Sequence, residues 1–113
     1  DGTDRRDIVY VKDVAFAIML AIQCRDAYGL YNIGSGETVS LYEQAKAIVK
    51  VFSNKPIEII CDRNKKNNIK SYCMSIEKAK KEINYKPNFA SFIDMMRDWK
   101  KEEEEGKYTT LFS

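Results

Sequence analysis

Arg6 is the residue of this sequence best suited to bind a phosphate group. It stands just before an apolar run, residues 8–11, whose β-branched and aromatic side chains are typical of a buried strand. A guanidinium at the mouth of such a strand can hold a phosphate through two N–H groups at once, which a lysine cannot do. The alternative is that Arg6 forms an ion pair with Asp7 or Asp4 at the surface.

A second group of cationic side chains lies in the polar segment 62–70, with an aromatic residue just beyond it. A tyrosine ring there would offer a flat face to a nucleotide base. The pattern therefore predicts a loop that either closes over an anionic ligand or remains a solvated surface loop. The residues are Arg63, Lys65, Lys66, Lys70 and Tyr72.

Two short motifs invite comparison with dinucleotide-dependent enzymes. The glycine turn 34–36 stands between an expected strand and an expected helix, but the third glycine of G-x-G-x-x-G would fall on Val39. The sequence therefore predicts a structural turn, which can still approach a ligand closely because glycine has no side chain. Tyr42 and Lys46 match Y-x-x-x-K, but they lie in a helix with no dinucleotide fold before it, so we interpret Lys46 as a solvated helix residue.

The absence of histidine excludes every serine or cysteine mechanism that relies on an imidazole base. The three cysteines, Cys24, Cys61 and Cys73, form no Cys-x-x-Cys pair, and free thiols in a reducing cytosol account for them. No metal site is predicted, because no ligands stand at short spacing.

The composition is that of a globular protein of one domain, residues 1–113, with 44% hydrophobic and 32% charged residues. The net charge of +2 is too small to indicate nucleic acid or an anionic membrane as a partner. The apolar run at residues 14–22 is far short of the ~20 residues that span a bilayer. A cytoplasmic location is the expectation.

Three strands are expected. The first, residues 8–11, is predicted to pass through an N-cap at Asp13 into a helix, residues 14–22, that is apolar all round and therefore buried on several sides. The other two are residues 30–33 and 57–61.

Serine residues are predicted to begin the remaining helices. Ser40 and Glu43 form the capping-box pattern that opens one helix. Ser75 is expected to cap a short helix, and Ser91 a last helix with Phe92 and Trp99 in its buried stripe. The fold class is therefore α/β, mixed and helix-rich, with about four helices and three short strands.

Three segments together resemble one family. Residues 2–3 with 6–15 resemble G-x-x-x-R-D-[FY]-[IV]-x-V-x-D-[VL]-A, residues 31–36 with 40–41 resemble Y-N-[IL]-G-x-G…S-[LV], and residues 75–87 resemble D-x-S-K-A-x-x-x-L-G-[WY]-x-P. These motifs belong to the NAD-dependent epimerase/dehydratase family of extended short-chain dehydrogenases, which act on nucleotide sugars. Their order and spacing are the family's, and they cover nearly all of the chain.

The resemblance implies the C-terminal part of an extended Rossmann-type enzyme, whose N-terminal NAD-binding domain is absent from this chain. It implies that Arg6 contacts the diphosphate of a nucleotide sugar and that Leu41 lies against the nucleotide. A later Arg…Asp…Tyr set of the family falls on Lys65, Asn68 and Tyr72, and Arg63 is the nearest arginine. Lysine thus replaces arginine, asparagine replaces aspartate, and a serine stands at position 75 where the family has aspartate.

We therefore expect a fragment that positions a UDP-, dTDP-, GDP- or CDP-linked sugar for chemistry in the missing domain. The fragment alone would have no catalytic residue and no cofactor, whereas its parent, an isomerase or a lyase, would use NAD(P) and form a homodimer. The parent's own Rossmann domain would be this chain's partner. The alternative is a free-standing, non-catalytic binding or interaction module with the same fold.

Overall fold

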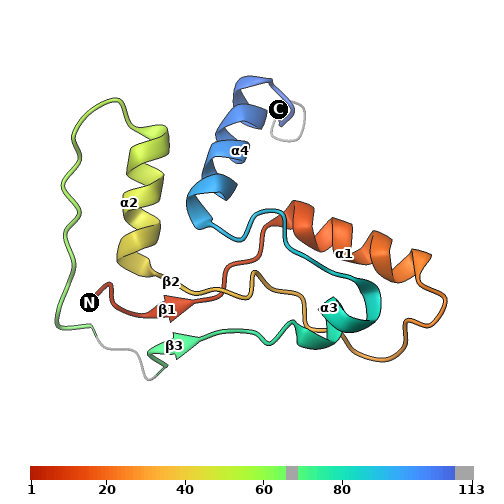
Figure 1. Cartoon of the computed structure of the whole chain (residues 1–113). Helices are drawn as coiled ribbons and strands as arrows, with labels where there is room; N and C mark the ends of the chain where they lie inside the picture. The colour runs from red at the N-terminus through yellow and green to blue at the C-terminus, as the bar shows by residue number, and fades with distance from the viewer. Residues whose placement is uncertain (66–68, 109–113) are drawn as a thin grey trace.

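The computed structural model describes residues 1–65 and 69–108, and the predicted fold class is confirmed within them (Figure 1). Four helices accompany a small three-stranded mixed sheet. No helix in these two ranges is long and apolar enough to cross a membrane. In chain order the elements are β1 Arg5–Arg6, α1 Val11–Gln23, β2 Val39–Ser40, α2 Leu41–Phe52, β3 Ser71–Tyr72, α3 Glu77–Ile83 and α4 Phe92–Glu104.

The sheet has β1 at its centre, between β2 and β3. β1 pairs with β2 in the antiparallel sense and with β3 in the parallel sense. Arg5 stands opposite Ser40 and Ser71, and Arg6 stands opposite Val39 and Tyr72. Segments from the beginning, middle and second half of the chain therefore meet at β1.

The three strand positions predicted from the sequence are wrong. Residues 8–11, 30–33 and 57–61 form no strand, although their apolar, β-branched character is typical of one. A strand exists only where a neighbouring strand accepts and donates its backbone hydrogen bonds. In the described structure those three segments have no such neighbour. The two-residue strands that contain Arg5, Ser40 and Ser71 have one.

Helix α1 departs from its prediction in two ways. It begins at Val11 after an N-cap at Tyr10, so Asp13 lies in the first turn and is not the N-cap. Asp13 is instead buried, and its carboxylate accepts the backbone amides of Asn88 and Phe89 at 2.8 and 2.9 Å. The helix is also not buried on several sides, because a stripe of apolar side chains at helical spacing is exposed. The exposed fractions are 67% for Val11, 56% for Ile18, 54% for Met19 and 79% for Ile22.

Helix α2 begins with the predicted capping box, which is confirmed. The Ser40 hydroxyl accepts the backbone amide of Glu43, and the Glu43 carboxylate accepts the amide of Ser40 at 2.7 Å. Its far end packs on α4, where the rings of Phe52 and Trp99 meet edge to face at 5.8 Å. Lys100 joins the same contact by donating to the carbonyl of Val51.

The two other serine caps are not formed as predicted. α3 has Ile76 at its N-cap in place of Ser75, and Ser91 occupies the N-cap position of α4 without a side-chain hydrogen bond. Both helices nevertheless supply core residues. One buried cluster joins Ala17 of α1 to the α3 side chains, and the other joins Tyr10 to Met95 and Met96 of α4.

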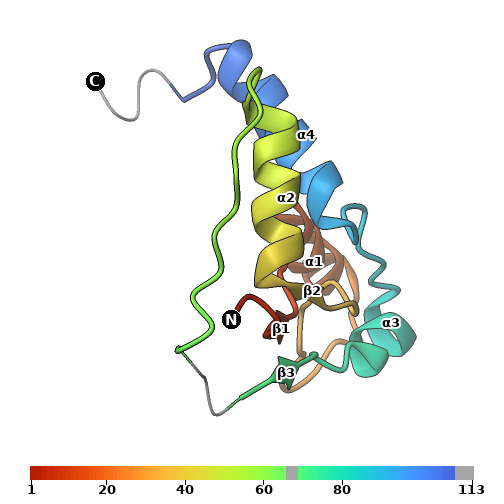
Figure 2. The same cartoon turned by 90° about the vertical axis from the view of Figure 1, so that its left-hand side faces the viewer.

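The chain is open and flat, with extents of 50 × 39 × 22 Å. Its radius of gyration is 16.8 Å, whereas about 13 Å is usual for a compact domain of this length. Its accessible surface is 8712 Å², compared with roughly 6,400 Å² for an ordinary monomer of 13.1 kDa. Helices α2 and α4 stand together above the sheet in both views, whereas α1 and α3 lie beyond its right-hand end in Figure 1 (Figures 1 and 2). The buried residues described form two separate clusters, so no single core joins all four helices.

Candidate functional site

Arg6 and Tyr72, both predicted as ligand contacts, are register partners on the parallel strands β1 and β3. Directly opposite residues of neighbouring strands place their side chains on the same face of a sheet. Arg6 is partly buried, and its guanidinium donates to the carbonyl of Arg5 at 2.7 Å. Tyr72 is 50% exposed. The sheet thus places the side chains of Arg6 and Tyr72 on the same face as neighbours across two strands.

Arg5 has a structural role that differs from that of its neighbour. Its guanidinium donates to the hydroxyl and the carbonyl of Thr38 at 2.9 and 2.7 Å. It also forms an ion pair with Glu43 at 3.1 Å. Successive residues of a strand point to opposite faces, so Arg5 fixes α2 to one face while Arg6 belongs to the other.

The carboxylate of Asp7 joins three segments at the end of β1. Its Oδ1 accepts the amide and the hydroxyl of Ser35 at 2.8 and 2.6 Å. Its Oδ2 accepts the amides of Gly36 and Met74 at 3.3 and 3.2 Å. The backbone amide of Asp7 donates to the carbonyl of Tyr72 at 2.9 Å. Asp7 therefore ties β1, the glycine turn and β3 together, a role that the sequence analysis did not assign to it.

The glycine turn does not fit a dinucleotide. A pyrophosphate cradle needs free backbone N–H groups, but those of Ser35 and Gly36 already donate to Asp7. The turn is fixed from its other side by Tyr85, whose hydroxyl donates to the carbonyl of Gly34 at 2.8 Å. Burial raises the pKa of Tyr85 to about 12, and the carboxylates of Asp13 and Asp7 act in the same direction. The described residues thus offer no cradle for NAD at this turn.

Leu41 and Lys65, two further predicted contacts, line one hollow of about 370 Å³. Leu41 is 45% exposed, and its amide donates to the carbonyl of Asp4 at 3.0 Å. Asp1 and Ile60, with residues close to each of them in the sequence, line the rest of the hollow. The structure therefore brings Leu41 and Lys65 together, as it brings Arg6 and Tyr72 together.

The two remaining predicted contacts are not placed in this hollow. Arg63 is exposed and is not among the residues that line it. Asn68, like Lys66 of the same loop, lies outside the described residues. Tyr42 and Lys46 of the Y-x-x-x-K motif lie on α2, with the ammonium 5.7 Å from the ring centroid, where they border a separate apolar hollow of about 640 Å³.

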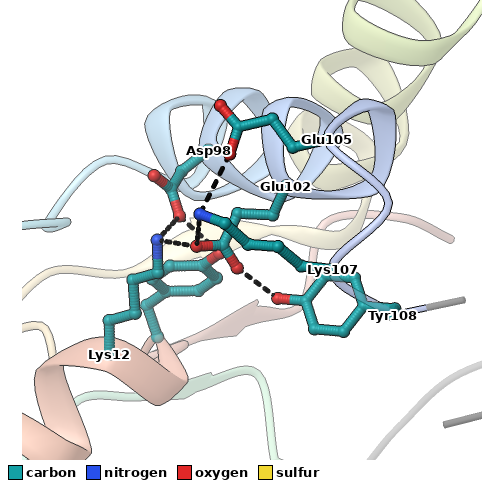
Figure 3. A network of polar contacts seen from close by, with 7 residues as sticks. Lys12, Asp98, Glu102, Glu105, Lys107 and Tyr108 are labelled. Carbon is teal, nitrogen blue, oxygen red and sulfur yellow. Dashed lines mark hydrogen bonds and ion pairs between the residues drawn. The ribbon is translucent and has the colours of Figure 1, made fainter. Parts of the chain in front are cut away.

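An ionic network joins the start of α1 to the end of α4 (Figure 3). Lys12 forms ion pairs with Asp98, at 2.6 Å, and with Glu102, and Tyr10 donates its hydroxyl to Asp98 at 2.9 Å. Tyr108 donates its hydroxyl to the second oxygen of Glu102. The hydrogen bond from Lys12 lowers the pKa of Glu102 to about 2, and the bond from Tyr108 adds to this effect.

The described cysteines, Cys24, Cys61 and Cys73, are free. In the described ranges no group of three or more histidine, cysteine, aspartate or glutamate side chains could hold a metal ion.

Comparison with known proteins agrees with this architecture. The model of the NAD dependent epimerase/dehydratase family matches residues 1–34. A UDP-glucose 4-epimerase of Corynebacterium glutamicum is 27% identical over 87% of this chain, and UDP-glucose 4-epimerase 2 of Oryza sativa subsp. japonica is 33% identical over 87%. The chain spans only 30% and 25%, respectively, of the length of these two relatives.

A solved structure shows the same arrangement of elements. The UDP-glucose 4-epimerase of Bifidobacterium longum, solved in complex with NAD+ and UDP, superposes with a TM-score of 0.70 at 29% identity. The superposition covers 94% of this chain and 32% of that one. In both kinds of comparison, this chain therefore spans between a quarter and a third of the length of the matched protein.

Proposed function

The chain belongs to the NAD-dependent epimerase/dehydratase family, and from this premise we propose that it is the C-terminal nucleotide-sugar-binding part of a longer epimerase or dehydratase. The observation that carries the proposal is the pairing of Arg6 with Tyr72 across β1 and β3. An arginine and an accessible tyrosine that are neighbours on one face of a sheet are suited to a ligand that has both a phosphate and a base.

Each predicted contact receives a role in this proposal. Arg6 binds the diphosphate, and Tyr72 lies against the base or the ribose. Leu41 contributes an apolar surface at the nearby hollow, and Lys65 adds a positive charge there. Arg63 is proposed as a further phosphate contact, and Asn68, which lies outside the described residues, keeps the ribose contact that the family resemblance implies.

The proposed ligand is a nucleoside diphosphate sugar, and UDP is the nucleotide to test first because the Bifidobacterium relative was solved with it. No hydride step is assigned to this chain, because its glycine turn uses its amides on Asp7. NAD(P), where the longer protein uses it, would be bound by residues outside this chain.

We further propose that the N-terminal Rossmann domain of the same longer protein covers α1. The exposed stripe of Val11, Ile18, Met19 and Ile22 forms an apolar helix face, and large apolar patches of this kind mark contact surfaces. The excess accessible surface and the open shape of the chain support the same partner. A free-standing module would be expected to turn this face toward its own core.

A titration of the longer protein with UDP tests the ligand assignment. Arg6→Ala is expected to raise the dissociation constant about 10- to 150-fold, which corresponds to about 1.5–3 kcal/mol for hydrogen bonds to a charged group. Arg25→Ala, at an exposed position after α1, is the matched control and is expected to leave binding unchanged. Unchanged UDP binding by the Arg6 variant, with normal thermal stability, would contradict the role given to Arg6.

A further inference from the structure

Arg5 joins strand β1 to the beginning of helix α2. Its register partner on β2 is Ser40, the N-cap of that helix. The Nε atom of Arg5 donates to the hydroxyl of Thr38 at 2.9 Å, and a second nitrogen donates to the Thr38 carbonyl at 2.7 Å. The third nitrogen forms the ion pair with Glu43 at 3.1 Å. All three nitrogens of the guanidinium are therefore engaged by residues at the start of β2 and in the first turn of α2.

The carboxylate oxygen that Arg5 contacts is also the one that caps the helix. Oε2 of Glu43 accepts the backbone amide of Ser40 at 2.7 Å, and the same atom forms the ion pair with Arg5. The side chains of Arg5 and Glu43 are 41% and 52% exposed, and ion pairs at such positions contribute little to stability. The contact therefore affects the placement of the helix start more than the stability of the fold.

The first turn of α2 is attached to the region of β1 at three points. The backbone amides of Leu41 and Tyr42 donate to two carbonyls just before β1, both at 3.0 Å. Arg5 adds the third attachment through Glu43. Successive residues are about 100° apart around a helix axis, so the three points do not lie on one line. Together they set the direction of the helix, whereas two points would leave it free to rotate.

The proposed ligand contacts lie on both sides of this junction. Arg6, proposed for the diphosphate, is on β1, and Leu41, proposed for the nucleotide, is the first residue of α2 (Figure 1). A ligand that touches both residues binds more tightly when the protein already holds them in the right arrangement, because binding then needs no reordering. A diphosphate without a nucleoside touches only the Arg6 side, so its affinity does not depend on the orientation of α2.

We propose that Arg5 is a positioning residue of this site, which orients Leu41 relative to Arg6 and so makes the site prefer a nucleoside diphosphate over a diphosphate alone. The inference rests on the proposed function, because the ligand contacts of Arg6 and Leu41 are taken from it. The family motif G-x-x-x-R-D specifies no residue at position 5, so the motif itself gives Arg5 no role.

Titrations of the longer protein with UDP and with inorganic pyrophosphate test the proposal. Arg5→Met is expected to raise the dissociation constant for UDP about 10-fold and that for pyrophosphate less than about 3-fold. Arg5→Lys keeps the charge but has no fork to reach Thr38 and Glu43 together, so we expect it to resemble Arg5→Met. Arg97→Met is the matched control, because Arg97 forms an exposed ion pair with Asp94 on α4, and it should change neither constant.

Three results of these titrations would overturn the proposal. Equal losses for UDP and pyrophosphate in Arg5→Met would mean that Arg5 acts on the phosphates. Full UDP affinity in Arg5→Lys would mean that the charge alone is sufficient. Unchanged UDP affinity in both Arg5 variants would mean that the arrangement of α2 does not depend on Arg5.

A double-mutant cycle shows whether Arg5 acts through Leu41. Leu41→Ala is expected to weaken the binding of UDP and to leave that of pyrophosphate unchanged. If Arg5 acts by placing Leu41, adding Arg5→Met to the Leu41→Ala variant should weaken UDP binding by no more than about 2-fold. Losses that multiply, as for two independent sites, would overturn the proposal.

Glu43→Gln provides a second variant if Arg5→Met does not fold. Glutamine can still complete the capping box, but it removes the charge that Arg5 contacts. A selective loss of UDP affinity is expected again, with pyrophosphate unaffected. UDP affinity equal to that of the parent in a folded Glu43→Gln variant would overturn the proposal.

Arg6→Ala on the same samples separates this inference from the proposed function. A parent that binds no UDP, or that binds it equally well as Arg6→Ala, would remove the proposed function and the inference with it. UDP binding that depends on Arg6 but not on Arg5 would overturn the inference alone. A loss in Arg6→Ala for both ligands, beside a loss for UDP only in the Arg5 variants, would support both.

Discussion

The carboxylate of Asp7 accepts both the amide and the hydroxyl of Ser35, at 2.8 and 2.6 Å. Asp7 directly follows Arg6, and its carboxylate also accepts the amide of Met74, two residues after Tyr72. The Asp7 carboxylate therefore holds together the two strands that carry Arg6 and Tyr72. The residue that organises the site is therefore distinct from the residues proposed to touch the ligand.

Asp7→Ala is expected to lower the free energy of unfolding of the 113-residue chain by about 3 kcal/mol. The change removes hydrogen bonds to a charged acceptor and leaves partly buried amides without a partner. Urea unfolding measures the difference. Asp26→Ala, at an exposed aspartate, is the control and is expected to stay within about 0.5 kcal/mol of the parent. Equal effects of the two changes would contradict the organising role of Asp7.

A local signal in the sequence was sufficient to predict the start of α2. Ser40 and Glu43 are three residues apart, and their capping box forms as predicted. The strands could not be placed in the same way, because a ladder depends on a second segment that the sequence pattern does not identify. The numbers of helices and strands agree with the prediction, whereas the strand positions and the pairing partners of β1 do not.

The same reason explains the error on α1. The apolar run at residues 14–22 predicts a helix that is buried on several sides, whereas the described helix has one packed surface and one exposed apolar stripe. One surface contacts α3 through Ala17, and the other is the exposed stripe that includes Ile18 and Ile22. The proposed Rossmann domain of a longer protein would supply the contact that this stripe does not make in the described structure.

Ile22→Lys gives a direct test of that second surface. In the longer protein, it is expected to cost about 1.5–3 kcal/mol of stability, since a buried apolar side chain is replaced by a charge. In the 113-residue chain, where Ile22 is 79% exposed, the change should be close to neutral and should reduce aggregation. Chemical unfolding of both proteins measures this, with Gln23→Lys as the neighbouring control. A neutral result in both would contradict the proposed cover of α1.

The network around Glu102 predicts an acid-sensitive contact between α1 and α4. Its pKa is lowered from an ordinary 4.5 to about 2, with the hydrogen bond from Lys12 as the largest cause. A lowered pKa means that the unfolded chain binds the proton more readily, so the contribution to stability is complete above about pH 4.5 and is lost as the pH falls toward 2. Asp98, whose pKa the same lysine lowers, acts in the same direction.

The measurement is the urea midpoint of the parent and of Glu102→Gln between pH 7 and pH 2. The variant is expected to be less stable at pH 7, and the difference should shrink below pH 4.5 as Glu102 of the parent becomes protonated. Glu103→Gln is the control, because Glu103 is exposed and adjacent in sequence. A difference that is constant across this range would mean that the charge of Glu102 does not stabilise the contact.

Tyr85→Phe tests the buried support of the glycine turn. Tyr85 is 1% exposed, and its hydroxyl donates to the carbonyl of Gly34, so the change leaves a buried carbonyl without its partner. We expect a loss of about 1–3 kcal/mol in the free energy of unfolding. Tyr28→Phe is the matched control, because Tyr28 is 87% exposed and its hydroxyl can be solvated.

The ionisation of Tyr85 provides a second readout for the same contact. Because burial raises its pKa to about 12, the hydroxyl stays protonated and keeps donating to Gly34 while exposed tyrosines ionise near pH 10. The contribution of Tyr85 to stability is therefore complete below about pH 10 and is lost as the pH rises toward 12. The pKa of Tyr10 is raised as well, mainly by burial and by its hydrogen bond to Asp98. Absorbance of the phenolate should therefore show a late-titrating component in the parent that is smaller by one tyrosine in Tyr85→Phe and unchanged in Tyr28→Phe. Titration of the parent as a single group near pH 10 would contradict the burial of this hydroxyl and the support it gives to the turn.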